Sequence, residues 1–188
     1  MAKWIEEGSE VHVCVFSTAE DSLPKGSRPT RLAEECHASL DVLGIRDDRR
    51  IVFRYPVRKL SYHRQDVLEN MVQLGQEIAP EWVVIPSGSD LHQDHATIHD
   101  EALRAFKHKT VLGYELPWNH ITFCASAFVT LERRHLDRKW EALTRYASQL
   151  ELGRPYFTKE FHESLARVRG LQVKSDWAEA FELIRAVL

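Results

Sequence analysis

The chain has 188 residues, of which 44% are hydrophobic and 28% are charged, and its net charge is −3. This composition is typical of a globular protein, and we expect a single domain over residues 1–188. No block of one charge sign indicates a nucleic-acid surface, and no run of about 20 apolar residues indicates a membrane span. The first ten residues lack the apolar core of a secretory signal, which predicts a cytoplasmic location.

The first half of the chain predicts alternating strands and helices. These strands and helices are expected at residues 11–17, 31–43, 51–55, 61–78 and 82–86, in the order strand, helix, strand, helix, strand. The last strand, WVVIP, is almost continuously apolar, as in a strand that is buried on both faces of a sheet. This order predicts an α/β fold with a parallel sheet, in which ligands bind beyond the carboxyl ends of the strands.

The second half of the chain is less regular. It predicts two strands and then three helices, over residues 110–117, 120–131, 136–150, 156–170 and 177–188. At the other end, MAKWIEEG (residues 1–8) resembles the end of a helix that closes on a glycine. A helix that leads into a parallel strand normally follows an earlier strand, so the pattern predicts that the first β segment is missing.

A cluster of histidines and carboxylates follows the WVVIP strand. The segment SGSDLHQDH places Asp90, His92, Asp94 and His95 at the start of a predicted helix, where His92 and His95 share one face. Imidazole is the commonest metal-binding side chain, and nearby carboxylates orient such rings by hydrogen bonding. The cluster therefore predicts metal binding or catalysis, with a polar helix cap as the alternative. His99 continues the same face, but an ordinary helix-surface histidine is its favoured interpretation.

The strand and the D-x-H-x-D-H segment that follows it resemble the second conserved motif of the PIG-L/LmbE-like family of zinc deacetylases, which includes GlcNAc-PI de-N-acetylase. Weaker similarities support this and cover most of the chain, at residues 8–17, 31–44, 112–117 and 139–149. The resemblance implies a Rossmann-like three-layer α/β fold with a mostly parallel sheet. It also implies hydrolysis of the N-acetyl group of an amino sugar, such as an N-acetylglucosamine conjugate, by a metal-activated water molecule.

The resemblance implies roles for individual residues as well. His95 would bind the metal ion, usually zinc, and His92 would stabilise the oxyanion or act as an acid. Asp94 would be a carboxylate that orients a histidine, and Asp90 would be a structural residue of the turn. Arg31 would lie near the substrate, although an exposed arginine at a helix start is its simpler interpretation.

The first motif of the family, His-Pro-Asp-Asp, does not occur in the sequence. In the family it supplies two metal ligands and the catalytic base, just before the helix whose end resembles MAKWIEEG. We therefore expect the chain to begin inside the first helix, without the central first strand, which would favour pairing between molecules. Either the natural protein is longer, or the chain is a remnant, or His12, Glu20 or Asp21 supplies the missing ligands.

Three functions can be compared on these observations. The first is a zinc-dependent de-N-acetylase with a small-molecule amino-sugar substrate and no nucleic-acid partner. The second is an inactive family member with a binding role, which the missing motif favours. The third, a nucleotide-binding Rossmann domain, requires a glycine-rich loop after a strand, and the sequence contains none. Zinc content would distinguish the first function from the second.

Overall fold

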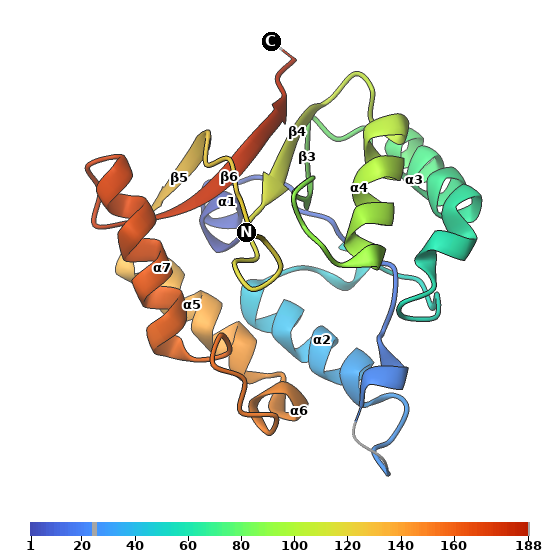
Figure 1. The fold of residues 1–188 in the computed structure, drawn as a ribbon, viewed down its shortest axis with the longest axis horizontal. Helices are drawn as coiled ribbons and strands as arrows, with labels where there is room; N and C mark the ends of the chain where they lie inside the picture. Colours follow the sequence, from blue (N-terminus) through green and yellow to red (C-terminus); the bar gives the residue numbers. More distant parts are fainter. Residues whose placement is uncertain (24–25, 188) are drawn as a thin grey trace. The chain divides into compact units, whose positions relative to one another are not determined.

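The structure is a computed structural model, and it describes residues 1–23 and 26–187. The chain is a mixed α/β protein in which most strand pairs are parallel (Figure 1). Among the described residues, no helix combines the length and the apolar character needed to cross a membrane.

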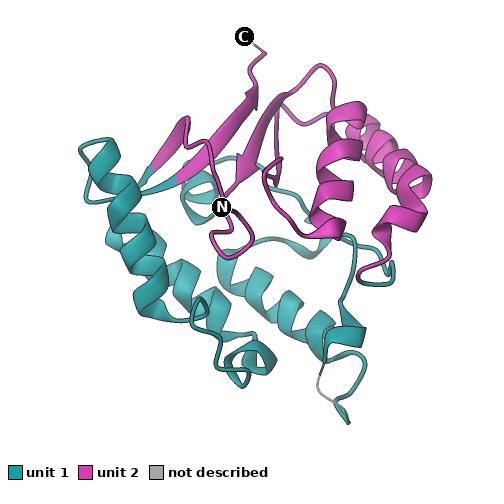
Figure 2. Cartoon of the chain, in the orientation of Figure 1, with its two compact units in different colours: residues 1–57, 130–179 teal, residues 58–129, 180–188 magenta. Residues whose placement is uncertain are grey.

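The chain folds into two compact units, which Figure 2 shows in different colours. Unit 1 comprises Met1–Val57 and Thr130–Glu179, and unit 2 comprises Arg58–Val129 and Ala180–Leu188. Each unit is therefore made from two separate stretches of the sequence.

Unit 1 contains a short parallel sheet and most of the helices. Strand β1 (Val13–Val15) pairs in parallel with β2 (Arg50–Val52). The helices of this unit are α1 (Ala2–Glu6), η1 (Glu20–Ser22), α2 (Arg31–Leu43), η2 (Asp47–Arg49), α5 (Arg133–Thr144), α6 (Ala147–Leu150) and α7 (Lys159–Gln172). The apolar side chains at the end of α2 pack with Ala142 of α5 in a buried cluster.

Helix α2 has the bounds that the sequence predicts. It ends at Gly44, whose φ of 79° lies in the left-handed region that glycine adopts without steric cost. This conformation lets the Ile45 N–H donate to the Leu40 carbonyl, with an N···O distance of 3.0 Å. Leu40 and Ile45 are both buried, so the turn also closes the apolar cluster.

Unit 2 contains most of a four-stranded sheet and two packed helices. The strands lie in the order β3 (Trp82–Pro86), β4 (Thr110–Tyr114), β6 (Trp177–Arg185) and β5 (Ala127–Leu131). Strands β3 and β4 are parallel, whereas β4 and β6 are antiparallel. After the short helix η3 (Leu60–His63), α3 (Arg64–Ile78) packs against α4 (Gln93–Ala105), as Figure 1 also shows.

The predicted fold class is confirmed, with one clear error near the C-terminus. The parallel pairs β1–β2 and β3–β4 are those of an α/β protein. However, residues 177–188 were expected to form a helix, and Trp177–Arg185 instead forms β6. Alanine, glutamate and leucine favour helices in isolation, but here Ala180 and Phe181 are buried and Phe181 pairs with Tyr114 of β4. Packing in the sheet therefore overrides the local propensity.

Candidate active site

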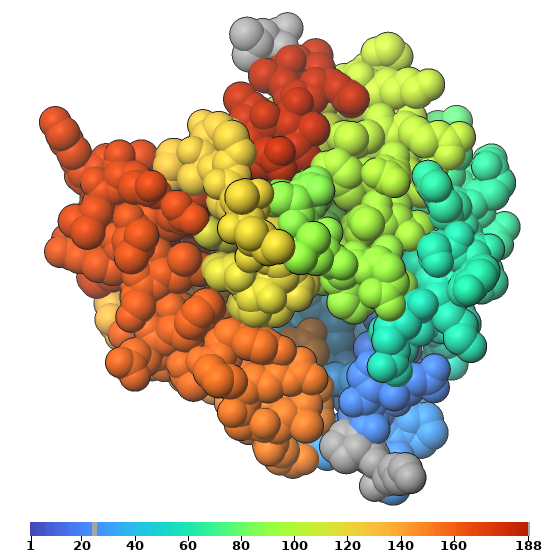
Figure 3. All heavy atoms as spheres, viewed as in Figure 1, coloured from blue at the N-terminus to red at the C-terminus, as the bar shows by residue number. Residues whose placement is uncertain are grey.

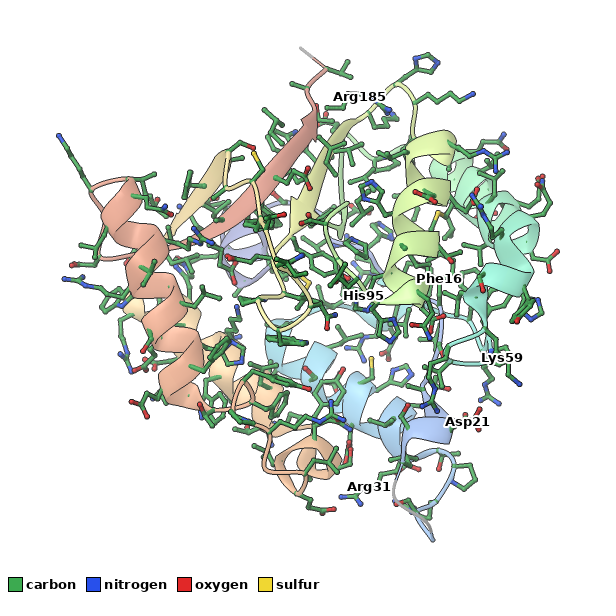
Figure 4. All side chains as sticks on the ribbon, viewed as in Figure 1. Phe16, Asp21, Arg31, Lys59, His95 and Arg185 are labelled. Carbon is green, nitrogen blue, oxygen red and sulfur yellow. The ribbon has the colours of Figure 1, made fainter. Side chains whose placement is uncertain are left out.

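The histidine cluster lies at the carboxyl end of β3, within unit 2. Strand β3 ends at Pro86, a turn follows in which the Asp90 N–H donates to the Ser87 carbonyl at 3.1 Å, and α4 then begins at Gln93. Figure 4 labels His95 near the start of α4. This is the end of a parallel sheet at which ligands bind in α/β proteins.

Asp90 holds the ring of His95 in one orientation. Its Oδ2 lies 2.7 Å from His95 Nδ1, and because a carboxylate only accepts, Nδ1–H is the donor. In the neutral ring, the lone pair is then on Nε2. The Asp90 side chain is fully buried, whereas 29% of the His95 side chain is exposed, so the ring reaches solvent. An imidazole that a carboxylate orients in this way is typical of metal-binding histidines.

His92 has the opposite arrangement of protons. Its Nδ1 lies 3.2 Å from the Asp94 backbone N–H, which only donates, so the neutral ring carries its proton on Nε2. Burial of the ring, and next the adjacent His95, lower the pKa of His92, which favours the neutral form at neutral pH. The two ring centroids are 4.6 Å apart. The neighbouring rings therefore present one acceptor nitrogen and one donor nitrogen.

The carboxylate of Asp94 makes contacts that differ from those expected. The family resemblance implied that it would orient a histidine, but it is buried and accepts the backbone N–H groups of Arg58 and Leu60. It thereby ties the first turn of α4 to the segment before α3. The carboxylate that orients a histidine by a hydrogen bond is that of Asp90, whereas Asp94 donates its backbone N–H to His92 Nδ1.

His99 makes contacts of a structural kind. Its Nδ1–H donates to the Pro86 carbonyl at 2.9 Å, which fastens α4 to the end of β3. Its ring covers Gly88, where an added Cβ would lie 3.1 Å from the ring atoms. His99 thus supports the turn that carries Asp90.

Arg31, the predicted substrate-binding residue, belongs to unit 1 (labelled in Figure 4). Its Nε donates to Glu35 Oε1 at 3.1 Å, and its Nη2 donates to Glu151 Oε1 at 2.6 Å. Glu35 in turn accepts the N–H and the hydroxyl of Ser148. The structure thus groups Asp90, the two histidines and Asp94 within unit 2, and it places Arg31 in a separate cluster of unit 1.

A complete zinc site is not found among the residues that the structure describes. A catalytic zinc ion normally has three protein ligands. Within the described ranges, no group of three or more histidine, cysteine, aspartate or glutamate side chains is placed to bind a metal ion together. His95 offers one nitrogen ligand through Nε2. The other ligands considered from the sequence, His12, Glu20 and Asp21, all belong to unit 1.

Two residues near Asp90 were not expected from the sequence. The Asn119 side-chain amide donates to Asp90 Oδ2 at 3.4 Å, and the Asn119 carbonyl accepts the Leu91 N–H at 3.1 Å. The neighbouring His120 contacts Ser89. These residues follow a different strand, β4, so no spacing in the sequence connects them with the 90–95 motif.

The family model for GlcNAc-PI de-N-acetylase, named PIG-L, matches residues 1–106. This is more than half of the chain, and the chain therefore belongs to the PIG-L family. A search of curated proteins found no match.

Several solved structures share the fold. The conserved protein TT1542 from Thermus thermophilus is 21% identical with a TM-score of 0.82, over 100% of this chain and 87% of that one. GalB, the 4-carboxy-2-hydroxymuconate hydratase of Pseudomonas putida KT2440, is 21% identical with a TM-score of 0.78, over 100% and 89%. The N,N'-diacetylchitobiose deacetylase of Pyrococcus horikoshii is 17% identical with a TM-score of 0.76, over 96% and 75%. At these identities, the similarity shows the fold alone.

Proposed function

We propose that the protein is a zinc-dependent de-N-acetylase that hydrolyses the N-acetyl group of an N-acetylated amino sugar or its conjugate. The observation that carries this proposal is the pair of adjacent imidazoles, His92 and His95, which present a donor and an acceptor nitrogen at the carboxyl end of β3. Family membership supports the same reaction, because the matching model describes a de-N-acetylase. The neighbour from Pyrococcus horikoshii acts on diacetylchitobiose, which supports N-acetylglucosamine units as the substrate class.

His92 has the properties needed to stabilise negative charge on the substrate. Its Nδ1 is occupied by the Asp94 N–H, so Nε2–H is the group available to the acetamide carbonyl oxygen. The lowered pKa of His92 keeps the ring a neutral donor at neutral pH. A donor that points to the position of a developing oxyanion typically contributes about 10²–10³ to kcat. Asp94 serves this role through its backbone N–H, since its carboxylate is occupied by two backbone amides.

His95 is the proposed metal ligand. Asp90 keeps the Nε2 lone pair of His95 free and holds the ring in one orientation, as the carboxylate partners of metal-binding histidines do. When bound, zinc would lower the pKa of a water molecule that attacks the acetamide carbon. The described residues offer zinc one nitrogen ligand at this site, His95 Nε2, and do not complete a zinc site by themselves.

The second candidate function is an inactive family member with a binding role. It is favoured by one observation, namely that no group of three metal-binding side chains occurs among the described residues.

Zinc binding by the full chain distinguishes the two functions. The metal-free protein is titrated with zinc, beside His95→Ala and the control His108→Ala, which changes an exposed histidine of the same unit. The de-N-acetylase requires about one zinc ion per chain. We expect His95→Ala to abolish this binding and His108→Ala to retain it. A wild-type chain that binds no zinc would support the inactive family member instead.

A further inference from the structure

A chain of hydrogen bonds connects the loop after β4 with β6 through the turn after β3. The Leu116 N–H donates to His120 Nε2 at 2.8 Å, so the neutral ring of His120 carries its proton on Nδ1. His120 Nδ1 lies 3.2 Å from Ser89 Oγ, and Ser89 Oγ lies 3.0 Å from Ser87 Oγ. Ser87 Oγ–H finally donates to Glu182 Oε2 at 2.6 Å. This series of hydrogen bonds begins at a backbone N–H, which only donates, and ends at a carboxylate, which only accepts. Each group therefore donates its proton to the next group on the side of Glu182.

The absence of a side chain at Gly113 leaves the space that this series of hydrogen bonds needs. At Gly113 of β4, an added Cβ would lie 2.9 Å from Ser87 Cα and 3.2 Å from Glu182 Oε2, so a larger residue would push the turn away from β6. The Gly88 N–H also donates to Glu182 Oε2, at 3.3 Å. Ser87 is 1% exposed, so the hydrogen bond between its hydroxyl group and Glu182 is shielded from competing water.

The same turn carries Asp90, the carboxylate that orients His95. Asn119, next to His120, reaches Asp90 Oδ2 with its amide and accepts the Leu91 N–H with its carbonyl. In Figure 3 the green atoms of the turn lie against the yellow atoms of this loop at the surface. The position of Asp90 therefore depends on two segments that are distant in the sequence. The loop after β4 contacts Asp90 through Asn119, and β6 contacts the turn through Glu182.

We propose that His120 and Glu182 are positioning residues that hold Asp90 against His95, so that His95 keeps its free nitrogen at Nε2. Among the described residues, neither His120 nor Glu182 forms a hydrogen bond with His95, and both act through the turn of Ser87–Asp90. A loosened turn would let the Asp90 carboxylate move away from Nδ1, and the His95 ring would then populate both neutral tautomers. This inference rests on the proposed function, because His95 Nε2 is the atom which that function uses.

The protonation of the histidine nitrogens can be read directly from nitrogen NMR of the full chain. The protein is labelled with ¹⁵N-histidine and measured without metal, so that imidazole proton–nitrogen correlations report each tautomer. In the wild type we expect the proton on Nδ1 in His95 and His120, and on Nε2 in His92. His120→Phe keeps a ring next to Phe123, whose centroid is 5.3 Å away, but it removes both hydrogen bonds. We expect the fraction of His95 with its proton on Nε2 to rise several-fold in this variant.

Three further variants and one control make the result decisive. Ser89→Ala interrupts the chain with the loss of one hydroxyl group, so it reports on the same proposal if His120→Phe does not fold. Glu182→Gln keeps an acceptor of the same size and should restore most of the wild-type tautomer that Glu182→Ala loses. The control His108→Phe changes an exposed histidine that takes no part in this series of hydrogen bonds, and it should leave the His95 tautomer unchanged.

An unchanged His95 tautomer in both His120→Phe and Ser89→Ala would overturn the proposal. The zinc titration separates this failure from failure of the proposed function. If the wild type binds no zinc and the tautomer still shifts in the variants, the positioning is correct and the function is not. If zinc binds and the tautomer does not shift, the function stands and the positioning does not.

Discussion

The buried carboxylates of Glu35 and Asp90 both hold nitrogen-bearing side chains, and they differ in which atoms they leave available to a ligand. In unit 1, Glu35 accepts from Arg31 and from both donors of Ser148, and Glu151 binds the other end of Arg31. In unit 2, Asp90 accepts from His95 Nδ1, and among the described residues the Nε2 of the same ring has no hydrogen-bond partner.

This difference indicates a structural role for the cluster around Glu35 and a ligand-binding or catalytic role for the cluster around Asp90. A cluster in which each polar group is satisfied contributes to stability and leaves nothing for a ligand. A half-buried imidazole ring in which one nitrogen is hydrogen-bonded and the other is free keeps a fixed orientation. Its free nitrogen remains able to bind a metal ion or a substrate. We therefore expect substitutions around Asp90 to change chemistry more than stability, and substitutions around Glu35 to do the reverse.

The largest effect is expected for His92→Ala on turnover. Loss of its Nε2–H donor should lower kcat about 10²–10³-fold, equivalent to about 2.7–4 kcal/mol, because the oxyanion loses a hydrogen bond. Acetate release measures this effect, and zinc binding should be retained because His95 is intact. A variant with nearly normal kcat would show that the role assigned to His92 is wrong.

Glu35→Ala should have the largest effect on stability. It leaves the N–H and hydroxyl of the fully buried Ser148 without their acceptor, at about 1–3 kcal/mol for each group. We expect urea unfolding to show a loss of about 2–6 kcal/mol for the two groups together, with the tautomers of His92 and His95 unchanged. The control Glu34→Ala removes the exposed pair with Arg28 and should cost less than about 1 kcal/mol. Equal effects of the two substitutions would contradict the structural importance of Glu35.

Asp90→Asn should weaken zinc binding more than it weakens the fold. An amide accepts a weaker hydrogen bond from His95 Nδ1–H than a carboxylate does, and loss of such a partner typically lowers metal affinity about 10–100-fold. Zinc titration gives the affinity, and urea unfolding should show a smaller change than Glu35→Ala does. If Asp90→Asn lost stability but kept its zinc affinity, the contrast between the two carboxylates would be refuted.

The smallest expected effect concerns a histidine whose free nitrogen is buried. Among the residues that the structure describes, His162 Nε2 has no hydrogen-bond partner. Burial of the ring, followed by the nearby Lys139, lowers the pKa of His162 to about 4. The ordinary value of 6.5 applies to the unfolded chain, so between these values the unfolded state binds more protons. The stability is therefore complete above about pH 6.5 and falls as the pH decreases towards 4.

We expect His162 to account for a loss of about 1–2 kcal/mol across this pH range, because partial solvent access reduces the full effect of the shift. Urea unfolding at several pH values measures it. His162→Phe should flatten the dependence in this range, whereas the exposed His108→Phe should not. An unchanged pH dependence in His162→Phe would exclude His162 as the source.

Much of the fold could be predicted because its signals are local. The WVVIP run and the D-x-H-x-D-H segment directly after it identified β3 and the start of α4. Strand β6 could not be identified in this way, because Ala180 and Phe181 adopt their conformation through β4, which lies far away in the sequence.

Within the candidate site, the four residues of the motif could be found from the sequence, but not their contacts. Asp90 and Asp94 are both carboxylates near the two histidines, and the turn geometry alone decides which of them reaches a ring. Asn119 and Glu182 reach the turn only because β4 lies beside β3 in the sheet and β6 lies beside β4. Local patterns contain no information on such long-range contacts.

The proposed function is tested most directly by acetate release from N-acetylglucosamine conjugates, measured with the full chain and zinc. We expect zinc-dependent release of acetate that a chelator stops and that both His92→Ala and His95→Ala reduce strongly. Wild-type protein that releases no acetate from these conjugates, with zinc supplied, would contradict the de-N-acetylase function and leave the inactive family member.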